Sequence, residues 1–189
     1  MGTFLAICGR SDRGLTPVLG AVLLVALTAL LASTLGAYAL GVELAAPGPH
    51  VAVAGEPVVA YDHADADREQ RLRLVHQGGT PVPVSELELV VTVPRTGDRA
   101  RVGDFPVASN KLDPTRVTGS GFLDTSHGEA VGSLSLAGPD RDGVWGAGDR
   151  LGLRVNSGAV RLAPGDTVVV RVVHTGSGQV VGETTLTAR

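Results

Sequence analysis

The sequence predicts an α+β protein, in which a long hydrophobic α-helix at the N-terminus precedes an all-β antiparallel sandwich. The first observation is the run from Leu15 to Val42, which holds 28 residues and no charged side chain. The second is the pattern after Pro47, where apolar and polar residues alternate between Gly- and Pro-rich turns, as in half-buried strands. Because no second helical pattern follows, we expect one helix and one β-domain.

The apolar run is long enough to cross a membrane as a helix. At about 1.5 Å per residue it would extend roughly 42 Å, against about 30 Å for the hydrocarbon layer of a bilayer. Thr16 is a predicted N-cap, and Pro17 suits the first turn of a helix, where a missing N–H costs little. Gly41 and Pro47-Gly48-Pro49 predict the end of the helix. We therefore predict a transmembrane helical segment over residues 15–46.

The residues before the run predict its orientation. Arg10 and Arg13 precede it, and only Asp12 opposes them. Positive charge ahead of a first hydrophobic helix keeps that end in the cytoplasm. The chain should therefore have three parts: a cytoplasmic leader over residues 1–14, the helical segment, and an extracellular β-sandwich domain over residues 47–189.

The junction between leader and helix carries a recognisable pattern. Arg13-Gly14-Leu15-Thr16-Pro17-Val18-Leu19-Gly20 leads straight into the apolar run. This stretch resembles the class III signal peptide of archaeal type IV pilins, especially the haloarchaeal type, with Arg13, Thr16 and Pro17 as its signal motif. The resemblance implies that a prepilin peptidase cuts between Gly14 and Leu15 and removes the leader. The stretch departs from the bacterial pilin pattern at Leu19, where bacterial pilins carry a Glu.

The same resemblance implies a function. The mature subunit would keep its helix, which would become the core of an extracellular pilus for surface adhesion. Its partners would be other copies of itself or related pilins, the prepilin peptidase and the pilus assembly machinery. Before processing it would be a single-pass protein of the cell membrane with its N-terminus inside, and after assembly it would lie in the extracellular pilus.

Two other interpretations of the segment remain open. An ordinary secretory signal could be cut after Ala37-Tyr38-Ala39, although its apolar core is usually 7–15 residues long. An uncleaved anchor fits the length but leaves the Arg-Gly-x-Thr-Pro pattern unexplained. The alternative function is a membrane-anchored extracytoplasmic binding module that does not polymerise, with residues 94–149 as its ligand surface. Only three Phe, two Tyr and one Trp are present, which counts against an aromatic binding platform.

Side chains of different size gather on opposite sides of the predicted helix when residues are placed 100° apart. The small ones are Ala26, Ala29, Ala32, Ser33, Gly36 and Ala37, and the bulky ones are Leu23, Leu27, Leu30, Leu31 and Leu35. Small residues at four-residue spacing let helix backbones approach closely, and bulky residues fill the space between neighbours. We predict that the small side packs against other helices.

Alternating segments predict the strands of the β-domain. They cover residues 51–61, 71–75, 87–93 and 180–187, together with two Gly-Asp turns that each lead into a strand at residues 148–155 and 165–172. Residues 94–149 are rich in Gly, Asp, Ser and Pro. We expect long surface loops there, with short strands around residues 102–107 and near Leu134. About seven short strands and no further helix favour an immunoglobulin-like sandwich.

No pattern in the sequence predicts an enzyme, a cofactor or a metal. The five histidines are scattered, and several aspartates are predicted to form solvated turns rather than a cation site: Asp62, Asp65, Asp67, Asp140, Asp142 and Asp149. The only cysteine, Cys8, lies in the leader, so the mature chain would have no disulfide and no thiolate metal site. The formal net charge of −3 becomes −4 without the leader, which gives no attraction to nucleic acid.

Overall fold

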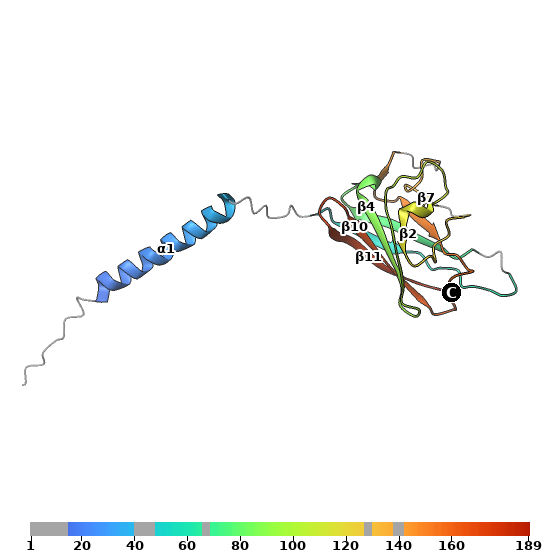
Figure 1. Cartoon of the computed structure of the whole chain (residues 1–189), viewed down its shortest axis with the longest axis horizontal. Coiled ribbons are helices and arrows are strands. Elements are labelled where there is room, and N and C mark those ends of the chain that lie inside the picture. Colours follow the sequence, from blue (N-terminus) through green and yellow to red (C-terminus); the bar gives the residue numbers. More distant parts are fainter. Residues whose placement is uncertain (1–14, 40–47, 66–68, 127–129, 138–141) are drawn as a thin grey trace, which may run out of the picture. The chain divides into compact units, whose positions relative to one another are not determined.

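The computed structural model describes residues 15–39, 48–65, 69–126, 130–137 and 142–189. The chain divides into two compact units, Met1–Ala46 and Pro47–Arg189, and each is described by itself (Figure 1). In the first unit the described residues form one helix, α1 (Leu15–Ala39). The helix begins at Leu15, so Thr16 lies inside the first turn and is not the N-cap that the sequence predicts, whereas Pro17 lies in the first turn as predicted. Residues 40–46 of the predicted segment lie outside the described residues.

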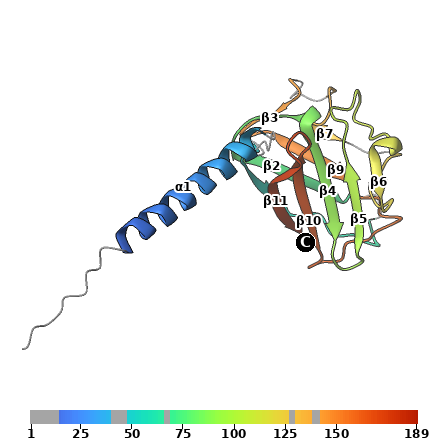
Figure 2. The ribbon, with the colours of Figure 1, turned by 60° about the vertical axis from the view of Figure 1, so that its left-hand side comes forward.

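The second unit consists of antiparallel sheets. The first sheet has four strands in the order β1 (Val51–Gly55), β2 (Arg71–Gly79), β9 (Arg150–Arg154) and β7 (Val131–Gly132). The second has five, which Figure 2 shows side by side: β11 (Gln179–Thr187), β10 (Thr167–His174), β4 (Leu87–Val93), β5 (Asp98–Val102) and β6 (Val117–Gly119). A short ribbon pairs β3 (Val82–Pro83) with β8 (Val144–Trp145), and two 3-10 turns lie in the connections, η2 (Val84–Glu86) and η3 (Pro114–Arg116).

The strand order of both large sheets is that of a variable-type immunoglobulin sandwich. That fold has strands A-B-E-D in one sheet and adds C′ and C″ to the G-F-C strands of the other. When these letters are assigned along the chain, with the β3–β8 ribbon set aside, they give β1-β2-β9-β7 and β11-β10-β4-β5-β6. This is the observed order. The predicted helix followed by an antiparallel, immunoglobulin-like sandwich is therefore confirmed.

The core lies between the two sheets and comes from alternate residues of facing strands. On β2, Leu72 and Leu74 are fully buried, and on β10 the buried residues are Val168, Val170 and Val172. Removing a side chain of this size from water stabilises the fold by about 1.5–3 kcal/mol. The alternation that predicts these strands therefore also supplies the apolar contacts between the sheets.

Residues 94–149 are not the surface loops that their composition predicts. They contain β5, β6, β7 and β8, and they contribute buried side chains to the core: Phe105, Val107, Leu112, Phe122, Leu123, Leu134 and Trp145. The rings of Trp145 and His76 meet edge to face, with 4.9 Å between their centroids. Gly132 has a φ of 69°, and a Cβ there would collide with the carbonyl oxygen of Arg150. The glycines of this stretch thus let the chain turn sharply while its apolar residues stay inside.

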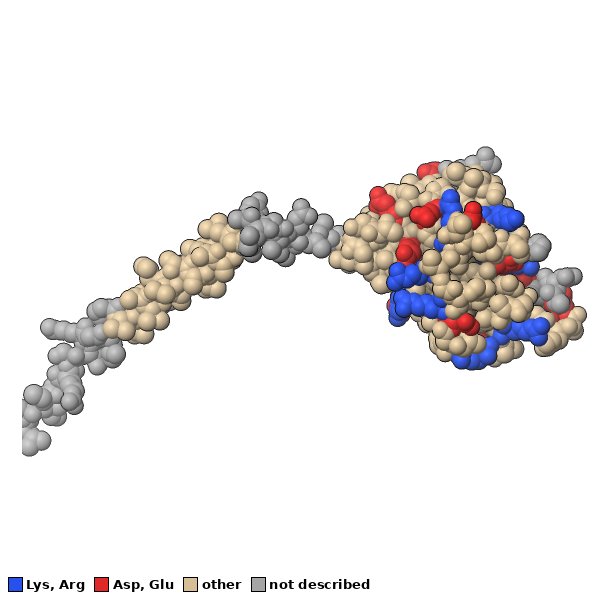
Figure 3. Space-filling view, in the orientation of Figure 1, with Lys and Arg blue, Asp and Glu red and all other residues tan. Residues whose placement is uncertain are grey.

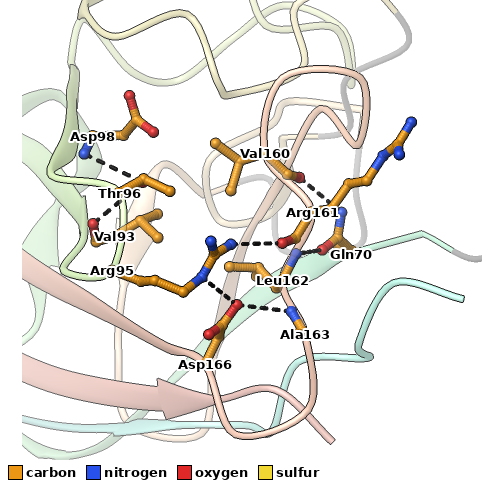
Figure 4. A network of polar contacts seen from close by, with 10 residues as sticks. All are labelled: Gln70, Val93, Arg95, Thr96, Asp98, Val160, Arg161, Leu162, Ala163 and Asp166. Atoms are coloured by element: carbon orange, nitrogen blue, oxygen red, sulfur yellow. Dashed lines mark hydrogen bonds and ion pairs between the residues drawn. The ribbon is translucent and has the colours of Figure 1, made fainter.

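The crossover from β9 to β10 is held by polar contacts on two sides (Figure 4). Gln70 is 1% exposed, and its side-chain amide donates to the Val160 carbonyl oxygen at 3.2 Å. Its amide oxygen accepts a hydrogen bond from the Leu162 N–H at 2.7 Å. Near the end of the crossover, the Arg95 guanidinium donates to Asp166 Oδ2 at 2.8 Å. The crossover is thereby tied to the four-stranded sheet at the start of β2 and to the five-stranded sheet at the β4–β5 turn.

Replacing Gln70 by Met keeps the length of the side chain but removes both of its hydrogen bonds. The Val160 carbonyl and the Leu162 N–H would stay buried without a partner, at a cost of about 1–3 kcal/mol each. We expect the free energy of unfolding to fall by about 2–4 kcal/mol. Urea unfolding of the full chain in detergent micelles, followed by the fluorescence of the single tryptophan, measures this change.

The matched control is Gln77→Met, because Gln77 is exposed on β2, the strand that directly follows Gln70. Exposed substitutions of this kind change the stability by no more than about 0.5 kcal/mol. Equal losses in the two variants would show that the buried amide has no special role.

Candidate functional site: an uncovered apolar helix

The apolar side chains of α1 have no cover within the described part of the chain. Its large apolar side chains, from Val18 to Leu35, are between 54% and 67% exposed. The segment Val18–Gly36 has a mean hydropathy of 2.4 and, by length and composition, can cross a membrane. An exposed apolar surface of this extent marks a contact with lipid or with other proteins.

The described side-chain hydroxyl groups of α1 form hydrogen bonds inside the helix. The hydroxyls of Thr28, Ser33 and Thr34 each donate to the carbonyl oxygen three residues earlier, at 2.8–2.9 Å. Such bonds allow Ser and Thr to lie in apolar surroundings without water. Figure 3 shows no Lys, Arg, Asp or Glu over the described part of α1, whereas both charge signs are spread over the β-domain. Lipid and a bundle of apolar helices are both compatible with this surface.

The residues of the predicted signal lie at the start of the helix. Leu15, Thr16 and Pro17 form the first turn of α1, while Arg13 and Gly14 lie outside the described residues. The position of the helix start places the predicted cut at the boundary of α1. Cleavage itself remains a prediction.

The small residues predicted to pack against other helices are open in the single chain. Those whose side chains are described are exposed in four cases, Ala26, Ala29, Ala32 and Ser33, and Gly36 is half-buried. Nothing lies within 4 Å of the place where a Cβ on Gly36 would be. The side chain of Ala37 lies outside the described set. The described side chains on this side of α1 are thus open, and their packing role remains a prediction.

Comparison with known families addresses this part of the chain. Residues 13–53 match the family model described as archaeal type IV pilin, N-terminal. The N-terminal region of this chain is that of an archaeal type IV pilin. The matched stretch begins at Arg13, includes all of α1 and ends in β1, so the resemblance seen in residues 13–20 is confirmed. Pilins are structural subunits rather than enzymes. No curated protein matches the chain.

In the β-domain, aspartates act as turn formers. Asp62, Asp113 and Asp142 each accept a hydrogen bond from the N–H two residues further on, at 2.9–3.1 Å. The N–H of Thr115, followed by its hydroxyl, lowers the pKa of the Asp113 carboxyl. Asp149 accepts a hydrogen bond from the N–H three residues before it, at 2.7 Å. The described residues contain no group of three His, Cys, Asp or Glu side chains that could hold a metal, and Asp67 and Asp140 lie outside them.

Sequence reasoning missed one polar cluster, because its members are 88 residues apart in the chain. His174, at the end of β10, contacts Ser177 Oγ through Nδ1 at 3.0 Å and Glu86 Oε2 through Nε2 at 2.9 Å. A Ser, a His and a Glu in contact resemble a catalytic triad. However, the N–H of Ser177 donates to His174 Nδ1 and that of Gly178 to His174 O, so neither is free to stabilise an oxyanion. The cluster therefore fixes the β10–β11 turn against η2.

Replacing Leu24, Leu27 and Leu31 by Arg tests whether α1 holds the chain in a membrane. Each Arg near the middle of a spanning helix costs about 2.5–3.5 kcal/mol on insertion scales. We expect the triple Arg variant to be lost from carbonate-washed membranes, whereas the matched triple Met variant should stay there. Retention of the Arg variant at the wild-type level would contradict a membrane role for α1.

Proposed function

We propose that the chain is a structural subunit of an extracellular filament, cut by a prepilin peptidase and assembled through α1. The observation that carries the proposal is a 25-residue helix whose described large apolar side chains, from Val18 to Leu35, are exposed. Such a helix is stable only in lipid or against other apolar helices. The family match over residues 13–53 favours the second surroundings in the mature state. Surface adhesion through the β-domain is the role that the pilin resemblance suggests.

The leader would keep the subunit in the membrane until it is cut. In the uncut chain, residues 1–14 remain on the cytoplasmic side. Drawing Arg10 and Arg13 into an apolar bundle would cost about 2.5 kcal/mol or more for each charge. Cleavage between Gly14 and Leu15 removes both charges. Helices of many copies can then pack together and replace the bilayer as the dry surroundings of α1.

A membrane-anchored binding module that never polymerises is the second candidate. It would keep α1 as a permanent anchor and bind a ligand through the β-domain. Its support is an open hollow of about 510 Å³ on the outer face of the five-stranded sheet. Shearing cells separates the two candidates. Protein recovered in sheared filaments supports the filament subunit, and protein found only in membranes supports the anchored module.

Changing Gly14 to Val should block processing. A peptidase that reaches a bond just outside the lipid needs an extended backbone and little bulk before the cut, and Gly provides both because it has no Cβ. Insertion should be unchanged, since the apolar run and both arginines remain. Intact-mass analysis should therefore find a mature chain that starts at Leu15 in the wild type and an uncut chain in Gly14→Val, which should form no filaments.

Gly36→Val is the matched control for processing, because it makes the same change far from the proposed cut. It should yield a chain that starts at Leu15. A Gly14→Val protein of mature mass would place the cut elsewhere. A wild-type start at Leu40 would indicate ordinary secretion, and a start at Met1 would indicate an anchor.

Adding bulk to the small side of α1 should prevent assembly after normal processing. Ala29→Leu hardly changes helix propensity, but it would hold neighbouring backbones apart. We expect at least a tenfold lower yield of sheared filaments, counted by electron microscopy, with membrane levels unchanged. Thr34→Leu adds a Leu among the bulky residues and should assemble nearly as the wild type. Equal yields from the two variants would refute the small side as the packing surface.

A further inference from the structure

Three arginines gather on the outer face of the five-stranded sheet. Arg171 on β10 and Arg101 on β5 are both register partners of Val90, on the strand β4 between them. Arg99 lies two residues along β5 on the same face, where its register partner is Thr92. We name the three arginines and Val90 the arginine face.

The apolar residue of the arginine face, Val90, is buried although it lies on the outer side of the sheet. Val90 points away from the core, since its neighbours Leu89 and Val91 belong to the core, yet it is only 2% exposed. The side chains beside it on this face are those of Arg101 and Arg171, whose aliphatic stems can cover an apolar residue while the charged ends stay in water. Both arginines therefore lie beside Val90 on the outer face, one on each neighbouring strand.

Carboxylates occupy these guanidinium groups only in part. Arg101 Nη1 lies 3.1 Å from Glu88 Oε1, and Arg171 Nε lies 2.7 Å from Glu183 Oε2. The two arginine side chains remain 55% and 44% exposed. Arg99 is exposed and has no carboxylate within 4 Å among the described residues. Three arginines against two glutamates leave one positive charge and several free N–H donors on the face.

A hollow lies over these residues and continues along the sheet. Its volume is about 510 Å³, and Arg99, Arg101 and Arg171 all line it. Two smaller hollows of about 190 and 230 Å³ share Arg101 with it and extend toward β6. Thr118 lines both smaller hollows, and Thr175 lines the largest and the 190 Å³ hollow. The result is an open track across the strands rather than an enclosed pocket.

We propose that the arginine face binds a linear polysaccharide that carries carboxylates, such as a polyuronate. The planar guanidinium group matches a carboxylate through two parallel N–H···O bonds, and threonine hydroxyls can bond to sugar hydroxyls. No aromatic side chain of the described residues lines the three hollows, so a neutral sugar would find no ring to stack on. A polymer with widely spaced charges fits an excess of one positive charge better than a dense polyanion does.

Many copies of the arginine face along one filament would bind a polymer tightly even if each copy binds weakly. An open face with few charged contacts binds one sugar unit weakly. Copies repeated along one filament would engage one polymer chain many times, and linked sites bind far more tightly than single ones. This step rests on the proposed filament function. Recognition by a single subunit does not, so the two can be tested apart.

The test uses the unassembled full chain in detergent micelles and purified polygalacturonate oligomers, with dextran of similar size as the neutral probe. Calorimetry should detect saturable binding of polygalacturonate and none of dextran. The Arg99→Gln and Arg171→Gln variants should each bind polygalacturonate at least tenfold more weakly. Arg73→Gln, which removes an exposed arginine from the other sheet, should stay within about twofold of the wild type.

Equal binding of dextran, an equal loss in Arg73→Gln, or no binding by the wild type would overturn the proposal. A second outcome concerns contact between copies. If Arg99→Gln lowers the mass of the micellar protein in sedimentation without any glycan, the face contacts another copy and the glycan proposal is wrong. This assay needs no filament. A negative binding result would therefore leave the proposed filament function unchanged, and a failure of the chain to assemble would leave the binding result unchanged.

Discussion

An apolar helix whose described side chains are exposed has to be covered by lipid or by other apolar helices, and this requirement governs the first unit of the chain. α1 has no charged residue, and its three described hydroxyl groups bond to carbonyl oxygens inside the helix. These described groups need no water. A bilayer and a bundle of like helices meet the same requirement, so one sequence can pass from the first to the second without refolding. The charges that would prevent that transfer lie before residue 14, in the part that a peptidase could remove.

The second unit meets a different requirement, because it has no cysteine with which to form a disulfide. Its stability comes from the apolar core. Its charged residues are arranged so that repulsion between like charges does not destabilise the sheets. On the four-stranded sheet Arg71 and Arg154 are directly opposite each other, which is unfavourable for like charges. Glu69 pairs with both, at 2.7 Å from Arg154 Nη1, and Glu56 in the same way pairs with two other arginines of that sheet. Exposed pairs add little stability singly, but these remove a repulsion.

The sequence predicts those parts of the structure that depend on local patterns. The start of α1 and the strands β2, β4, β9, β10 and β11 could be predicted, since each is a run or an alternation bounded by Gly or Pro turns. The structure of residues 94–149 could not be predicted in this way. Turn residues dominate the composition of this region, but a few apolar side chains are buried in the core and hold the region against it. The pairing of Leu72 with Leu153 depends on the order of strands in a sheet, which no local pattern contains. For the same reason the helix was predictable as a site, whereas the arginine face was not.

The N-terminal end of the β-domain is hydrogen-bonded at two points, Gly48 and His50. The Gly48 N–H donates to Gln179 Oε1 at 3.1 Å, and a Cβ on Gly48 would come within 2.8 Å of that oxygen. Two residues later, His50 O accepts a hydrogen bond from the Thr80 N–H at 2.9 Å. Gln179 begins β11 and Thr80 follows β2, so these two bonds lead to different sheets. A force applied at the N-terminal end of the β-domain therefore acts on both large sheets through these two bonds. Without them it would act first on β1, an edge strand that is paired only with β2. Gly48 and His50 therefore attach the N-terminal end of the β-domain to both large sheets, and not to the neighbour of β1 alone.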